Sequence, residues 1–176
     1  MFTVPFDYLR EASTNRIMRE EALEEIKKNL DWIQIIPHGL THMRGTFGEV
    51  ERADYYTMRD LILPAINDAF GRDGLPYVQG FKAPYWQWND DVVRALDEAG
   101  WWGADDRNQP QMPHTKRRYT YTHDLTEPFW ESTNDTLLVH GHIDGVSAND
   151  LEKCFLNIFK LPVDTQWKFA TDFITE

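Results

Sequence analysis

Short apolar runs that favour β-strands alternate along this chain with segments that have helical periodicity. The expected strands cover residues 2–5, 32–36, 77–81, 101–104, 136–140 and 167–174. The expected helices cover residues 16–30, 53–70, 89–100 and 149–160. Alternation of this kind favours a parallel sheet or barrel wrapped by helices. The sequence therefore predicts an α/β fold, and its 176 residues fit one domain over 1–176.

Capping residues and prolines set the expected boundaries of these elements. Asn89 is an N-cap for the helix that follows it, and Asn149 is expected to cap the last helix. Pro64 is expected to kink or break the helix over 53–70. Residues 105–130 are polar and carry three prolines, which predicts a long loop.

The charge balance argues against two classes of partner. The chain has 18 basic and 29 acidic residues, a net charge of −11. Such a surface repels phosphate backbones and anionic lipid, so we expect neither nucleic acid nor membrane partners. Cys154 is the only cysteine, which excludes an intrachain disulfide. The N-terminus lacks the pattern of a signal peptide, so the chain as written is expected to be cytoplasmic.

Polar segments directly follow three of the expected strands. They are PHGLTH at 37–42, KAPYW at 82–86 and HGHID at 140–144. Active sites of parallel α/β folds lie at the carboxyl ends of the strands. Four of the six histidines, His38, His42, His140 and His142, are therefore expected to meet at one edge of the sheet.

Each histidine pair has two interpretations. His38 and His42 are spaced so that both imidazoles can bind one divalent ion; alternatively, His38 caps the strand and His42 faces solvent. One of His140 and His142 can donate a proton to a leaving group, because histidine titrates near neutral pH; alternatively, both are structural. The other two histidines, His114 and His123, are expected to be solvated.

The three segments, in this order, resemble the polysaccharide deacetylase family, the NodB-type carbohydrate esterases. HGLTH at 38–42 is similar to the motif that supplies two metal ligands in that family. FKAPYW at 81–86 is similar to the segment that walls the substrate groove. LLVHGH at 137–142 is similar to the strand end that carries the catalytic acid.

The resemblance implies a distorted, incomplete (β/α) barrel of the polysaccharide deacetylase type. It implies metal-dependent removal of acetyl groups, on nitrogen or oxygen, from a sugar or polysaccharide. His38 and His42 would bind zinc or another divalent transition metal, which polarises the acetyl carbonyl. The catalytic residues would be His140, His142 and Lys82. The substrate would lie against Pro84, Tyr85 and Trp86.

Two departures from the family pattern bear on activity. The family's first strand ends in two aspartates, the general base and the third metal ligand, and no such pair follows residues 2–5 here. Lys82 stands where the family has an arginine that braces the base, and lysine cannot form the same bidentate contact. Asp7, Asp105 and Asp106 each follow an expected strand and could fill the open role, with Asp7 as the third metal ligand.

Three hypotheses follow from these departures. The chain is an active deacetylase, or a non-catalytic remnant that binds a sugar or a metal, or the product of a reading frame that omits an upstream strand. An incomplete barrel exposes sheet edges, and exposed edges tend to pair. We therefore expect a homodimer or a rearranged N-terminal segment that covers the gap.

Overall fold

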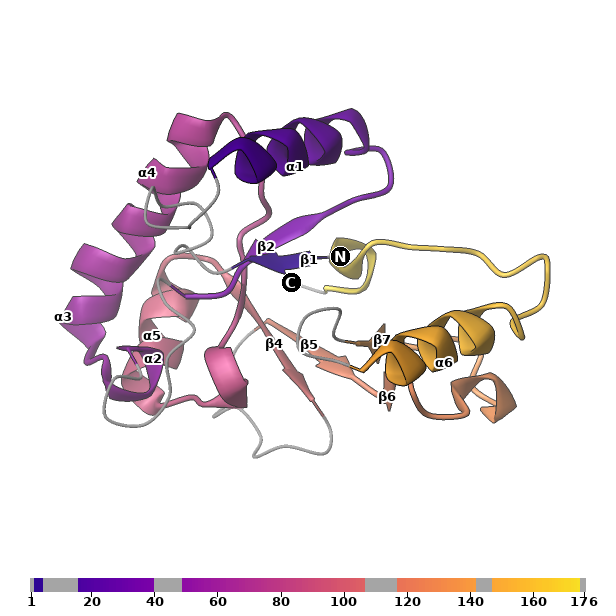
Figure 1. Cartoon of the computed structure of the whole chain (residues 1–176). Coiled ribbons are helices and arrows are strands. Elements are labelled where there is room, and N and C mark those ends of the chain that lie inside the picture. The colour runs from indigo at the N-terminus through magenta and orange to yellow at the C-terminus, as the bar shows by residue number, and fades with distance from the viewer. Residues whose placement is uncertain (1, 5–15, 40–48, 107–116, 142–146, 175–176) are drawn as a thin grey trace.

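Residues 2–4, 16–39, 49–106, 117–141 and 147–174 are described by a computed structural model of the chain. Within these residues all strand pairs are parallel, and they form three small sheets (Figure 1). The first pairs β1 (Phe2–Val4) with β2 (Ile35–Pro37). The second contains β3 (Gly80–Lys82), β4 (Trp102–Asp106) and β5 (Arg118–Tyr121). The third pairs β6 (His123–Asp124) with β7 (Val139–His140).

Backbone hydrogen bonds link the first sheet to the second and the second to the third. The amide of Val78, just before β3, donates to the carbonyl of Ile35 in β2 at 3.0 Å. Only Thr122 separates β5 from β6, and its amide donates to Leu138 just before β7 at 2.7 Å. β6 thus continues the line of β5, and β7 lies beside β6, so that parallel strands follow one another across the molecule from β1 to β7.

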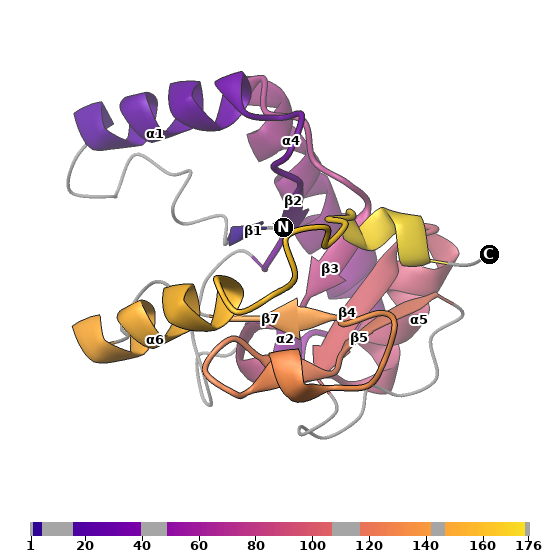
Figure 2. The ribbon, with the colours of Figure 1, turned by 90° about the vertical axis from the view of Figure 1, so that its right-hand side faces the viewer.

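Helices cover these strands on the outside. They are α1 (Arg16–Lys28), α2 (Glu49–Arg52), α3 (Tyr55–Thr57), a π-helical turn (Met58–Ile62), α4 (Leu63–Asp73), α5 (Asp90–Glu98) and α6 (Ala148–Ile158). Short 3₁₀ turns cover Pro84–Trp86, Phe129–Glu131 and Ala170–Phe173. Figures 1 and 2 show α1 and α6 at opposite ends of the strand series, with α4 and α5 near the middle strands.

Alternate residues of the strands enter two separate cores. Ile35 and Phe81 pack with Val92 and Leu96 of α5 in the core beneath the helices. Ile36 points the other way and joins a second core of mostly aromatic residues. The members of the second core are Ile36, Trp86, Trp102, Ala104, Tyr119, Tyr121 and Ala170. This second face carries the candidate site.

The helix α5 and its predicted cap are confirmed. The Oδ1 atom of Asn89 accepts from the amide of Val92 at 2.8 Å, and its Nδ2 donates to the carbonyls of Val50 and Ala53 at 3.1 and 3.0 Å. One side chain therefore starts α5 and ties it to α2.

Changing Asn89 to Ala is expected to lower the free energy of unfolding by about 2–3 kcal/mol. The lost cap contributes about 1 kcal/mol, and each of the two further hydrogen bonds about 1 kcal/mol. Urea unfolding measures the difference. The control is Ser147→Ala, which removes the cap of α6, a 3.1 Å bond from the amide of Asp150, together with an exposed 2.8 Å bond from the Ser147 hydroxyl to the Asp150 carboxylate, and should cost about 1 kcal/mol. Equal losses would contradict this double role of Asn89.

The predicted loop over 105–130 is wrong in its described part. The strand β4 extends to Asp106, and β5 and β6 lie within the segment. In β5, Tyr119 and Tyr121 are buried while Arg118 is exposed. The strand therefore has buried tyrosines at every second position, with polar residues between them. Phe129–Glu131 forms a 3₁₀ turn.

Two boundary predictions also need correction. The expected strand over 167–174 is instead a 3₁₀ turn, closed by Asp172, whose carboxylate accepts from the amide of Phe169 at 3.0 Å. The irregularity expected at Pro64 lies directly before it, in the π-helical turn over Met58–Ile62, and Pro64 itself lies in the first turn of α4. The cap of α6 is Ser147, not Asn149.

Large apolar side chains are exposed on and after α6. They are Phe155, Leu156, Phe159, Val163 and Trp167. Apolar surface of this kind is typical of contact regions, and the homodimer remains a prediction. Among the described residues, no helix has both the length and the apolar character that crossing a membrane requires.

Candidate functional site

His38 lies directly after β2, where it is buried with only 5% of its surface exposed. Its Nδ1 is 2.6 Å from the carbonyl oxygen of Lys82, at the end of β3. A carbonyl oxygen only accepts hydrogen bonds, so Nδ1 carries the proton and the imidazole lone pair is on Nε2. A backbone carbonyl that fixes the tautomer in this way is the usual support of a metal-binding histidine.

The side chain of Lys82 is on the aromatic face of the sheet. It is 6% exposed, and its Nζ lies 4.1 Å from the centre of the Trp86 ring. An ammonium over an indole face is attracted by about 0.5–2 kcal/mol, more when it is desolvated. Lys82, predicted to be catalytic, thus contacts the aromatic wall directly.

The turn Pro84–Trp86 has an unusual backbone. Tyr85 and Trp86 have φ values of 54° and 59°, in the left-handed region that residues other than glycine rarely adopt. Such strain costs about 1–3 kcal/mol per residue and collects at functional sites. As a result Tyr85 is 40% exposed, whereas Pro84 and Trp86 are buried. Of the three predicted substrate-binding residues, Tyr85 is the one open to a ligand.

His140 ends β7 and faces Asp124, its partner in the β6–β7 register. Its Nδ1 lies 3.6 Å from Oδ2 of Asp124 and 3.3 Å from the carbonyl oxygen of His123. Both oxygens are acceptors, so Nδ1 carries a proton, and in the neutral ring the lone pair is on Nε2.

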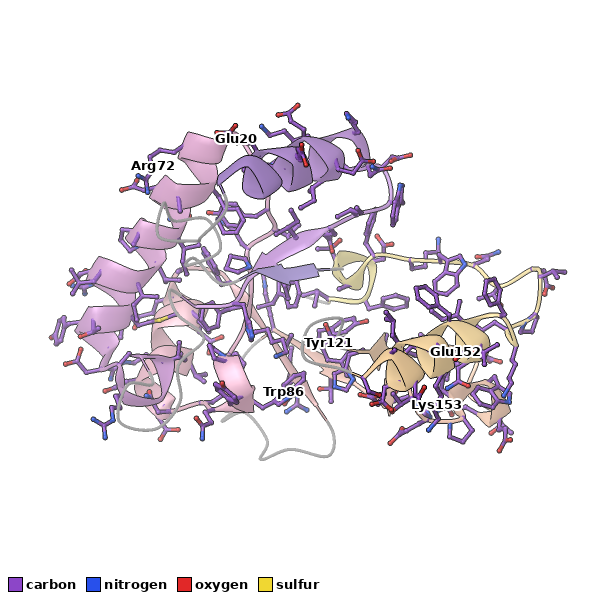
Figure 3. All side chains as sticks on the ribbon, viewed as in Figure 1. Glu20, Arg72, Trp86, Tyr121, Glu152 and Lys153 are labelled. Atoms are coloured by element: carbon purple, nitrogen blue, oxygen red, sulfur yellow. The ribbon has the colours of Figure 1, made fainter. Side chains whose placement is uncertain are left out.

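Two aromatic rings flank the imidazole of His140. Tyr121 stacks on it, with ring centres 5.1 Å apart and planes inclined by 27°. Trp86 lies 5.3 Å away at 60°. Burial raises the pKa of Tyr121 well above its ordinary value, and the neighbouring Tyr119 adds to this, so the phenol stays neutral. Figure 3 labels Trp86 and Tyr121, which lie close together.

These contacts form one continuous series at the carboxyl edge of the strands. The imidazole of His38 contacts the backbone of Lys82, whose ammonium covers Trp86, which packs against His140. The described residues of all three predicted segments therefore lie next to one another. Two histidines, His38 and His140, are brought to the same edge by strands that are far apart in the sequence.

Several predicted site residues fall outside the described part of the chain. They are Asp7, His42 and His142. Among the residues that are described, no three His, Cys, Asp or Glu side chains gather closely enough to hold a metal ion. The proposed ligand set of His38, His42 and Asp7 includes only one described member.

Of the two aspartates at the end of β4, Asp105 is on the wrong face. Ala104 pairs with Tyr119 in the aromatic core, so the next residue, Asp105, points to the opposite side. There it lies 3.9 Å from Nη1 of Arg118. Asp106 occupies the register position opposite Tyr121. Asp106 and Asp7 therefore remain as candidates for the base.

Changing Asp105 to Asn is expected to raise the free energy of unfolding by about 1 kcal/mol. Asp105 is 1% exposed, and within the described structure its two oxygens have no hydrogen-bond partner. A buried charge costs more than a buried amide, and the Arg118 side chain, 40% exposed, keeps its hydration. Urea unfolding checks this, with the exposed Asp91→Asn as a control expected within about 0.5 kcal/mol of wild type. A clear loss of stability would show that the Asp105 carboxylate is needed.

A pocket of about 250 Å³ lies elsewhere, at the amino ends of the strands. Its lining residues are Val78, Gln79, Gly100, Trp102, Arg117, Thr171 and Ile174. Several of these directly precede β3, β4 or β5, so the pocket opens at the edge opposite His38 and His140. It takes no part in the candidate site.

Sequence reasoning missed Asp124 and Tyr121, because both lie in the segment interpreted as a loop. The signal was present in RYTYTHD, where aromatic and polar residues alternate before an aspartate. His123, expected to be solvated, is half-buried, and its Nδ1 contacts the hydroxyl of Thr122 at 2.9 Å.

Comparison of the chain with protein-family models, with curated proteins and with solved structures finds no significant match. The functional interpretation therefore depends on the motifs and on the geometry of the site.

Proposed function

We propose that this chain is a metal-dependent hydrolase that removes acetyl groups from an acetylated sugar or polysaccharide. The observation that carries the proposal is the contact series from His38 through Lys82 and Trp86 to His140. It brings a histidine suited to a metal and a histidine suited to proton transfer to one edge of parallel strands.

The metal would be zinc or a similar divalent ion held by His38, with His42 and Asp7 as the further ligands. The contact of His38 Nδ1 with the Lys82 carbonyl fits this role, because it leaves Nε2 as the coordinating nitrogen. When bound, the metal supplies Lewis-acid polarisation of the acetyl carbonyl.

His140 would act as the general acid. Water adds to the acetyl carbon, the bond from that carbon to nitrogen or oxygen breaks, and the Nε2 proton of His140 passes to the leaving atom. The acid form is the imidazolium, protonated on both nitrogens: Asp124 and the carbonyl of His123 lie at Nδ1, so the proton that leaves is the one on Nε2. His142 is the alternative acid.

The proton of the attacking water needs a carboxylate. Asp106, whose register partner is Tyr121, and Asp7 are the two candidates. Lys82 contributes a positive charge on the same face as Trp86. The exposed ring of Tyr85 offers a surface on which a sugar ring can stack.

A second candidate is a non-catalytic module that binds a sugar or a metal through the same edge. One observation favours it: the ammonium of Lys82 lies over the Trp86 ring. This contact stabilises the wall of a binding site whether or not Lys82 takes part in catalysis.

Acetate release by the full chain, loaded with Zn²⁺ or Co²⁺, tests the proposal. An N-acetylated chitooligosaccharide and an O-acetylated xylooligosaccharide distinguish amide from ester substrates. We expect acetate from one of them and none from the chelated protein. Protein that carries metal but releases acetate from neither would support the binding module instead.

A further inference from the structure

We propose that Tyr121 is a positioning residue that fixes the plane of the His140 imidazole. The two rings are stacked, with centres 5.1 Å apart and planes inclined by 27°. The consequence for catalysis rests on the proposed function, whereas the effect on His140 itself does not.

Tyr121 can hold a neighbour in place because it is itself held on two sides. It is 5% exposed. The ring of Tyr119 meets it edge-on at 4.9 Å and 78°, and the ring of Trp86 at 5.9 Å and 79°. Trp86 in turn lies beneath the ammonium of Lys82. Edge-to-face packing of this kind has a preferred geometry and leaves little room for rotation.

The fixed plane matters because the hydrogen bonding of His140 depends on ring orientation. Its Nδ1 reaches the carbonyl of His123 at 3.3 Å and the carboxylate of Asp124 at 3.6 Å, and both distances change when the ring turns. A flat ring against one face of the imidazole restricts its rotation about the Cβ–Cγ bond. The direction of Nε2, from which a proton would leave, is then determined.

Tyr121 acts through His140, so its loss should lower kcat more than it raises KM. Tyr121→Met fills a similar volume without a flat face and is expected to lower kcat about 10- to 100-fold, the range that misplacement of a reacting group produces. Tyr121→Phe keeps the stack and should remain within about twofold of wild type. The comparison variant is Tyr119→Met, which removes a tyrosine of similar burial, 8% exposed, that supports Tyr121 edge-on but does not itself stack on His140, so its effect should be smaller than that of Tyr121→Met.

Imidazole NMR of the full chain gives a readout that needs no substrate. The signals of His140 are assigned by their loss in His140→Gln. In the wild type, its ring protons should be shifted upfield by the stacked phenol and its nitrogens should show one tautomer, protonated at Nδ1. Tyr121→Phe should keep both features, and Tyr121→Met should lose the upfield shift and mix the tautomers.

Unshifted His140 protons in the wild type would overturn the proposal, even if Tyr121→Met does not fold. Equal effects of Tyr121→Met and Tyr119→Met on the His140 signals would also overturn it. If the NMR result is as expected but no substrate is hydrolysed, the positioning role stands and the deacetylase proposal fails.

Discussion

Changing His140 to Gln is expected to lower kcat for acetate release by about 100- to 10,000-fold, the usual contribution of a general acid. Glutamine has a similar size and can still donate to the carbonyl of His123, but it cannot release a proton to a leaving amine or alcohol. KM should change little, because the neighbours of this side chain are Tyr121, Trp86 and Asp124. Initial rates over a range of substrate concentrations separate the two constants.

His123→Gln is the matched control. His123 is the residue before Asp124, and its backbone carbonyl, which contacts His140, is unaffected by the change. Its rate should stay within about twofold of wild type. If His140→Gln retains full activity while His142→Gln loses it, the acid is His142, and His140 has a structural role.

Changing His38 to Gln is expected to weaken binding of zinc by more than about 100-fold. Loss of an outer hydrogen-bond partner of a metal ligand already costs about 10- to 100-fold, and this change removes the nitrogen that we propose as a ligand itself. Wild-type protein should gain about 2.7 kcal/mol of stability at a free metal concentration 100 times its Kd. The variant at the same concentration should gain almost none. Titration calorimetry and unfolding with and without metal measure both quantities.

His42→Ala should cause the same loss of metal, because both histidines belong to the HGLTH motif. His123→Gln should bind metal normally. Wild-type protein that is purified without metal and takes none up would contradict the metal assignment, and with it the deacetylase proposal.

The sequence predicted helices better than strands, for a physical reason. The helix α5 was identified with its cap because the polar Asn89 and the apolar periodicity of Val92 and Leu96 are local signals. The strand β5 was missed because its pattern depends on a partner: Tyr119 and Tyr121 are core residues only once β4 lies beside them. The segment over 118–121 is rich in polar residues, yet it forms a strand because it pairs with β4.

The candidate site was predicted in outline from motif positions. His38, Lys82 and His140 were expected at one edge because each follows an apolar run, and their contacts agree with that expectation. The role of Trp86 was not predictable from sequence. A left-handed turn at Tyr85 and Trp86 buries the indole and exposes the phenol, and no sequence motif for that turn is present. The choice between Asp105 and Asp106 required the register of β4 with β5.

The most direct test of the whole account is whether a metal held by His38 is close to His140. Co²⁺ is bound to the full chain, and the imidazole signals of His140 are followed by NMR as the ion is added. We expect strong paramagnetic shifts of the His140 ring protons at one equivalent of Co²⁺, and their absence in His38→Gln. Stoichiometric binding of Co²⁺ that leaves the His140 signals unshifted would place metal and acid apart and contradict the proposed site.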